Sequence, residues 1–170
     1  TYMNKIAVGN DVPIDAVDLD FSVEKNIKNI ADVKNKDIKK ITACLLDRPR
    51  HKSIIEELIR LNVNLKLITD GDVSGALLVT DQKHNVDVFL GIGGGPEGVL
   101  AAAALRVIGG QMMGRLIFNG DEIQINRAKE MGITDINKKY TGEDMAKGDV
   151  IFAAAGVTDG YMLQGVKKQN

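Results

Sequence analysis

The feature that most constrains the fold is the alternation of short apolar segments with longer segments of helical periodicity. Apolar runs at residues 41–46, 63–69 and 86–92 have the length and composition of buried strands, and segments with helical spacing separate them. Such alternation is typical of a sheet that is covered by helices on both faces. We therefore predict an α/β fold, built as a layered α-β-α sandwich.

The remaining elements follow from capping residues, helical spacing and glycine stops. We expect further strands at 6–8, which we place at an edge of the sheet, and at 150–155. The strongest helix covers 96–108, with proline in its first turn and glycine after its end. The other expected helices cover 22–31, 51–61, 73–79 and 121–131, and a short helix begins at Thr141, which resembles a capping box with Asp144.

Composition excludes several classes of function. The chain has 170 residues, of which 44% are hydrophobic, enough for one compact domain or one half of a larger one. The formal net charge of −1 argues against nucleic acid or an anionic membrane as a partner. The apolar run at 99–105 is too short to span a bilayer. Cys44 is the single cysteine, which excludes an internal disulfide framework and a Cys/His zinc cluster and fits a cytoplasmic protein.

Each of four predicted strands is followed by glycines, carboxylates or arginines. Ligands bind α/β sheets at the carboxyl ends of strands, so these segments predict a binding site. The segments are Asp-Arg-Pro-Arg-His at 47–51, Asp-Gly-Asp at 70–72, Gly-Gly-Gly-Pro-Glu-Gly at 93–98 and Gly-Val-Thr-Asp-Gly at 156–160.

The glycine segment at 93–98 offers the clearest mechanism. Three glycines let the backbone approach a ligand closely, and the helix that begins at Pro96 favours an anion such as phosphate at its start. Glu97 either complements the helix dipole or binds a divalent cation that bridges to this phosphate. The segment also fits G-x-G-x-x-G, which alone is a weak sign of dinucleotide binding.

The other two segments each allow two interpretations. Asp70 and Asp72 belong either to a simple turn or to a pair of acceptors for sugar hydroxyls. Arg48 and Arg50 lie either in a solvated loop or, because Pro49 stiffens it, in a phosphate-binding loop.

Four further residues are assigned no functional role. We expect His51 and His84 to be ordinary polar residues, because the sequence shows no ligand partners for them. We expect Met112 and Met113 to lie in the core.

Taken together, these motifs resemble class II fructose-1,6-bisphosphatase, which in some bacteria is also a sedoheptulose-1,7-bisphosphatase. The resemblance covers essentially the whole chain, and its long block at 70–112 is specific. The family belongs to the lithium-sensitive, metal-dependent phosphatases. The residues that carry the resemblance lie at 47–51, 68–73, 91–99, 101–105 and 109–112.

The resemblance implies that residues 1–170 form the substrate-binding, C-terminal half of a sugar-phosphatase fold. Family members have an N-terminal domain that carries most metal-binding acids and the catalytic threonine, and Thr1-Tyr2-Met3 resembles the domain junction. This chain would then contain no catalytic residue and one metal ligand, Glu97. The substrate-binding residues implied are Tyr2, Arg48, Pro49, Arg50, Asp70, Gly71, Asp72 and Gly94, and the family's usual alanine is replaced by Gly95.

The implied reaction is hydrolysis of the 1-phosphate of fructose 1,6-bisphosphate to fructose 6-phosphate, in gluconeogenesis or glycerol metabolism. The resemblance implies Mn²⁺ or Mg²⁺ as cofactor, lithium as inhibitor and a homo-oligomer as the complete enzyme. From their chemistry alone, we expect Arg48 and Arg50 to bind the distal 6-phosphate. Two alternatives stay open: a dinucleotide-binding domain that uses 93–98, and a non-catalytic sugar-phosphate sensor.

Overall fold

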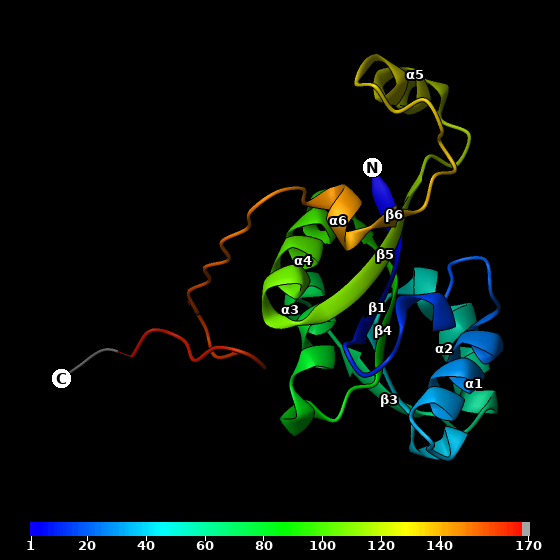
Figure 1. Ribbon diagram of the computed structural model, residues 1–170, viewed down its shortest axis with the longest axis vertical. Helices are drawn as coiled ribbons and strands as arrows, with labels where there is room; N and C mark the ends of the chain where they lie inside the picture. Colours follow the sequence, from blue (N-terminus) through cyan, green and yellow to red (C-terminus); the bar gives the residue numbers. More distant parts are fainter. Residues whose placement is uncertain (168–170) are drawn as a thin grey trace.

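A single six-stranded mixed sheet forms the centre of the computed structural model, which describes residues 1–167 (Figure 1). The strands lie in the order β3-β2-β4-β1-β5-β6. Their bounds are β1 Tyr2–Gly9, β2 Thr42–Leu46, β3 Asn64–Ile68, β4 Val88–Gly94, β5 Gly110–Ile117 and β6 Tyr140–Thr141.

Helices cover both faces of the sheet, which confirms the predicted α-β-α sandwich. One core cluster joins β1 and β2 to α1 and α2, and a second joins the opposite face to α3 and α4 (Figure 1). The helices are α1 Val23–Val33, α2 Lys52–Arg60, α3 Asp72–Leu77, α4 Gly95–Ile108, α5 Glu122–Glu130 and α6 Gly142–Met145. Short 3₁₀ helices are η1 Ile14–Ala16, η2 Ile38–Lys40, η3 Pro49–His51, η4 Leu78–Thr80 and η5 Gln82–His84.

Strand β1 lies inside the sheet, so its prediction as an edge strand is wrong. It pairs antiparallel with β4 on one side and with β5 on the other. Ile6, Ala7 and Val8 are all buried, because helices cover both faces of the strand. The antiparallel direction places Tyr2, at the start of β1, opposite Gly94, at the end of β4. The start of β1 therefore lies at the same end of the sheet as the carboxyl end of β4.

The sequence analysis also missed one long strand and predicted one that does not form. Strand β5 was not predicted, because its glycines interrupt the apolar pattern, although Met112 is buried in the core as expected. The strand expected at 150–155 is irregular, and Ile151 is 96% exposed. An apolar run alone does not specify a partner strand, and this segment pairs with no edge of the sheet within residues 1–167.

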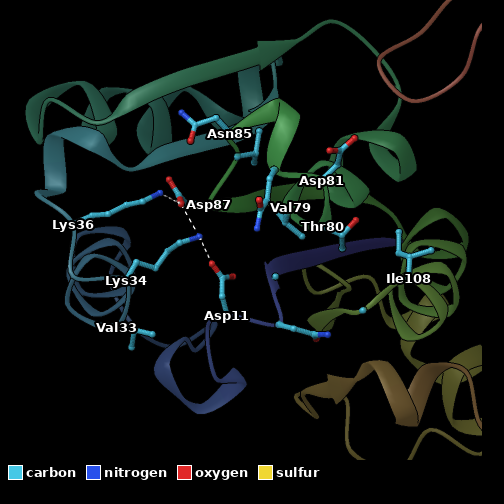
Figure 2. A pocket seen from close by; sticks show the side chains of 15 residues that line it. Asp11, Val33, Lys34, Lys36, Val79, Thr80, Asp81, Asn85, Asp87 and Ile108 are labelled. Carbon is cyan, nitrogen blue, oxygen red and sulfur yellow. Dashed lines mark hydrogen bonds and ion pairs between the residues drawn. The ribbon is translucent and has the colours of Figure 1, made fainter.

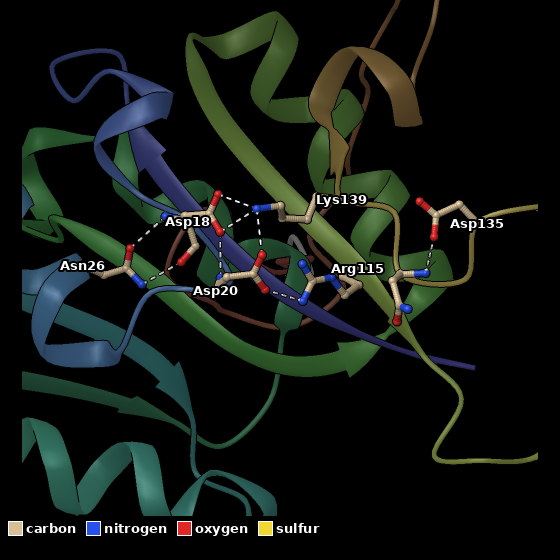
Figure 3. A network of polar contacts seen from close by, with 7 residues as sticks. Asp18, Asp20, Asn26, Arg115, Asp135 and Lys139 are labelled. Atoms are coloured by element: carbon tan, nitrogen blue, oxygen red, sulfur yellow. Dashed lines mark hydrogen bonds and ion pairs between the residues drawn. The ribbon is translucent and has the colours of Figure 1, made fainter.

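Helix α5 stands apart from the body on an arm between β5 and β6 (Figure 1). A network of charged side chains ties the base of this arm to the loop before α1 (Figure 3). Arg115 donates to Asp20 at 2.7 Å, and Lys139 donates to Asp18 at 2.6 Å. The hydrogen bonds from Arg115 and Lys139 hold the pKa of Asp20 far below its usual range. This network fixes where the arm leaves the sandwich.

Across residues 1–167, every helix is too short or too polar to cross a lipid bilayer.

Candidate functional site

Three loops that follow β2, β3 and β4 meet at one edge of the sheet and enclose a pocket of about 340 Å³. These three strands are parallel neighbours, so their carboxyl ends lie at the same edge. The pocket contains seven predicted site residues: Arg48, Arg50, Asp70, Gly71, Asp72, Gly94 and Glu97. The sequence thus predicted three segments that lie together, whereas the fourth predicted segment, at 156–160, does not line this pocket.

The two other predicted substrate-binding residues lie beside this pocket. Tyr2 is half exposed, and its ring centroid is 5.2 Å from the Arg50 guanidinium carbon. Pro49 begins the 3₁₀ helix η3 between the two arginines and fixes the local backbone, as its predicted stiffening role requires.

The arginine loop is held by contacts to the backbone. Arg48 donates to the Asp47 carbonyl at 2.9 Å, and the Nε atom of Arg50 donates to the Ile92 carbonyl at 2.7 Å. Because Nε donates its hydrogen bond to Ile92, near the end of β4, the exposed guanidinium of Arg50 is held near the glycine turn. Its terminal nitrogens can therefore bind an anion without first losing much side-chain freedom.

His51 is a buried residue that links the ends of β2 and β4. Its Nδ1 atom lies 2.7 Å from the Leu46 carbonyl, and the Ile92 amide donates to its Nε2 atom at 2.8 Å. The ring packs against Gly91, whose φ of +145° favours glycine. His51 therefore has a specific structural task, which the sequence did not reveal.

The Asp-Gly-Asp segment is both a turn and part of the pocket wall. Gly71 has a φ of +89° and precedes α3, which begins at Asp72. Asp70 is exposed, whereas the Asp72 side chain is 12% exposed. The two interpretations offered by the sequence are therefore compatible, since the turn is what brings both carboxyl groups to the pocket.

The glycine turn joins β4 directly to α4. Proline lies in the first turn of α4, as predicted, and Glu97 lies in the same turn. A side chain at Gly94 would overlap the Glu97 carboxylate, which folds back over this glycine. The turn therefore presents backbone N–H groups and a carboxylate at one side of the pocket.

Lys5 is a site residue that the sequence analysis missed. It is 1% exposed, and its Nζ atom contacts the Asp72 carboxylate and donates to the Gly94 carbonyl at 3.1 Å. A signal was present, because Lys5 lies between Met3 and Ala7 on a face of the strand that is otherwise apolar. A lysine at such a position must find a partner in the protein.

Glu97 fits one ligand of a divalent cation, but the described chain does not form a complete metal site. Glu97 is exposed and lines the pocket beside the glycine turn. Residues 1–167 hold no group of three or more histidine, cysteine, aspartate or glutamate side chains placed to bind one metal ion. A metal bound here therefore needs ligands beyond those in this structure.

Two hollows elsewhere on the described structure have at least twice the volume of this pocket. One, of about 820 Å³, lies at the opposite end of the sheet (Figure 2). It contains buried Asp87, which is 2.7 Å from the amino groups of both Lys34 and Lys36. The other, of about 700 Å³, is a mainly apolar groove beside α5. Neither contains a predicted site residue, so residue chemistry outweighs volume in locating the site.

The topology argues against a dinucleotide-binding domain. Such a domain needs the glycine turn to lead through a helix to an adjacent parallel strand. Here α4 leads to β5, and antiparallel β1 lies between β4 and β5. The Asp121 carboxylate, which the alternative would use, instead accepts the Gln124 amide at 3.1 Å as the cap of α5.

A sequence model of the bacterial, glpX-encoded fructose-1,6-bisphosphatase family matches residues 1–170. The chain belongs to this family. It is 36% identical to D-fructose 1,6-bisphosphatase class 2/sedoheptulose 1,7-bisphosphatase of Trichodesmium erythraeum, over 98% of this chain and 51% of the relative. Relatives of the same name in Microcystis aeruginosa and Synechocystis are 36% and 35% identical with the same coverage. The chain thus spans about half the length of these curated relatives.

Proposed function

We propose that this chain is the sugar-phosphate-binding part of a class II fructose-1,6-bisphosphatase. The complete enzyme would hydrolyse the 1-phosphate of fructose 1,6-bisphosphate, and sedoheptulose 1,7-bisphosphate is a second candidate substrate because the relatives' names include it. The observation that carries the proposal is the meeting of arginines, paired aspartates and a glycine-helix turn in one pocket. A sugar bisphosphate needs these three kinds of partner.

Each wall of the pocket suits one part of such a substrate. Arg48 and Arg50 offer planar cationic donors for the phosphate that does not react. Asp70 and Asp72 offer acceptors for sugar hydroxyls. The start of α4 offers backbone donors and a positive dipole for the phosphate that is transferred.

Glu97 would contribute one ligand to Mn²⁺ or Mg²⁺ at the reacting phosphate. Bound metal would supply polarisation of the phosphoryl group and an activated water. The other ligands and the catalytic residue would come from a further domain outside this sequence, which the coverage of half of each relative supports. This chain's own task is to orient the sugar and to hold both phosphates.

The test compares the intact enzyme with residues 1–170 alone. The intact enzyme should release phosphate from fructose 1,6-bisphosphate only with Mn²⁺ or Mg²⁺, and lithium should inhibit it. The chain alone should fold and bind the substrate without hydrolysing it. Substrate binding without hydrolysis by the intact enzyme would instead favour a sugar-phosphate sensor, and hydrolysis by residues 1–170 alone would refute the division of tasks.

A further inference from the structure

Lys5 is the most unusual buried group in the described chain. Lys5 is 1% exposed, and in the described residues the other charged side chain buried to this degree is that of Asp87, at 2%. It shares a face of β1 with Met3 and Ala7, whose side chains belong to the apolar core beneath α3 and α4. Burial of an ammonium group is costly unless it is paired. The site must therefore use Lys5 in a way that an apolar side chain does not satisfy.

The contacts of Lys5 join two walls of the pocket. Its Nζ atom contacts the Asp72 carboxylate, at the start of α3, and lies 3.1 Å from the Gly94 carbonyl, at the end of β4. Lys5 itself lies in β1, which pairs with β4 along seven residues. One side chain therefore links the sugar-binding acid, the phosphate-binding turn and the central strand.

Glycines shape the path of this side chain. A Cβ at Gly98 would lie 3.4 Å from Cδ of Lys5, and a Cβ at Gly93 would lie 2.9 Å from its Nζ. A Cβ at position 93 would also overlap the Asp72 carboxylate. The close approach of Lys5 and Asp72 thus occupies space that these two positions leave open because they lack side chains.

We infer that Lys5 is a positioning residue for substrate binding, acting through Asp72. Its ammonium group holds the Asp72 carboxylate in a fixed orientation at the pocket wall. It also fixes the Gly94 carbonyl, so the sugar-binding and phosphate-binding walls keep one spacing. The inference rests on the proposed function, because it assigns Asp72 to the substrate's hydroxyl groups.

The decisive experiment is steady-state kinetics of Lys5→Met in the intact enzyme with Mn²⁺ and fructose 1,6-bisphosphate. Methionine keeps the length and the apolar stem and removes only the ammonium group. A lost acceptor for the sugar should raise KM about tenfold to a hundredfold, the range of one hydrogen bond to a charged group, with kcat nearly unchanged. Damage to folding would instead lower kcat through the active fraction and leave KM unchanged.

A double-mutant cycle with Asp72→Asn tests whether Lys5 acts through Asp72. The double variant should have the same kcat/KM as Asp72→Asn alone, within about twofold, since the same acceptor is lost in both. The double variant also lacks the Asp72 charge that Lys5→Met alone leaves unpaired. The double variant can therefore be measured even where Lys5→Met fails to fold. If the losses in kcat/KM of the two single variants multiply in the double variant, the inference is overturned. An unchanged KM in Lys5→Met would also overturn it.

Lys36→Met is the matched control, because it breaks another lysine–aspartate pair at the far end of the sheet. It should leave KM unchanged, and an equal rise there would also overturn the inference. Failure of the proposed function is distinguishable. In that case the wild-type enzyme would release no phosphate from any sugar bisphosphate, which would overturn both claims together.

Discussion

The backbone amide of Ile92 donates a hydrogen bond of 2.8 Å to the Nε2 atom of His51, across the gap between β4 and β2. The opposite ring nitrogen, Nδ1, lies 2.7 Å from the Leu46 carbonyl, so one imidazole ring contacts backbone groups of both strands. Direct pairing between β2 and β4 is limited to residues 43–44 and 88–89. His51 therefore replaces the missing backbone pairing at the edge that carries the pocket.

His51→Leu should lower the free energy of unfolding by at least about 2 kcal/mol, because each orphaned buried backbone group costs about 1–3 kcal/mol. Urea denaturation measures this change. His84→Leu is the control, since His84 makes only a long contact of 3.6 Å to Asp81, and it should cost less than about 1 kcal/mol. Equal losses in both variants would remove the bridging role from His51.

Glu97→Gln should abolish most turnover of the intact enzyme while the fold persists. Glutamine removes the charge that we propose binds the metal, whereas the lost interaction with the helix dipole costs only about 0.3–1 kcal/mol. Activity titrated against Mn²⁺ and a thermal melt of each variant give both quantities. Glu122→Gln, in the first turn of α5, is the matched control and should keep full activity. Near-normal turnover of Glu97→Gln at limiting Mn²⁺ would return Glu97 to a dipole role.

Arg48→Ala and Arg50→Ala should each lower kcat/KM for fructose 1,6-bisphosphate about tenfold to a hundredfold, the effect of about 1.5–3 kcal/mol for a charged hydrogen bond. The loss should be small for a sugar monophosphate that lacks the distal phosphate. Arg48→Lys and Arg50→Lys should restore kcat/KM only in part, because lysine keeps the charge but lacks the planar guanidinium fork. Arg60→Ala, on the exposed side of α2, serves as control. Equal proportional losses on both substrates would exclude recognition of the distal phosphate.

Asp87 should make the fold sensitive to acid. Burial by itself raises the pKa of this carboxyl group, but hydrogen bonds from Lys34, Lys36 and the Thr42 amide together lower it below its usual value of 3.8. The folded pKa is thus below the unfolded pKa. Its contribution to stability is therefore present above about pH 4 and lost as the pH falls through the folded pKa.

Asp87→Asn should lower the free energy of unfolding at pH 7 by about 1–3 kcal/mol, because Lys36 loses its carboxylate partner and Lys34 keeps only Asp11. Between pH 7 and pH 3, the variant should lose less stability than the wild type. Urea denaturation at a series of pH values measures both effects, with exposed Asp32→Asn as control. A parallel fall of stability in wild type and Asp87→Asn would contradict this assignment.

The sequence predicted the sandwich and most of the pocket because both depend on local patterns. Parallel strands bring their carboxyl ends together, so polar segments after 41–46, 63–69 and 86–92 had to meet. The place of β1 could not be predicted in the same way, since pairing with β4 and β5 depends on contacts about 80 residues or more away in sequence. An apolar run at 150–155 likewise predicted a strand where residues 1–167 offer no partner strand.

Lys5 and His51 were missed as structural members of the site for a related physical reason. Each depends on partners from other elements, which spacing within one segment does not reveal. Lys5 becomes meaningful only when β1 lies beside the glycine turn. His51 becomes meaningful only when β2 and β4 are neighbours.

The central claim is that residues 1–170 hold a sugar bisphosphate in the pocket at the carboxyl ends of β2, β3 and β4. The most direct measurement is a titration of the isotope-labelled chain with fructose 1,6-bisphosphate, followed by backbone amide NMR shifts. The account predicts saturable shifts at 48–51, 70–72 and 93–97, with little change around Lys34 and Lys36. Shifts confined to the far hollow around those lysines, or no saturable shifts at all, would contradict it.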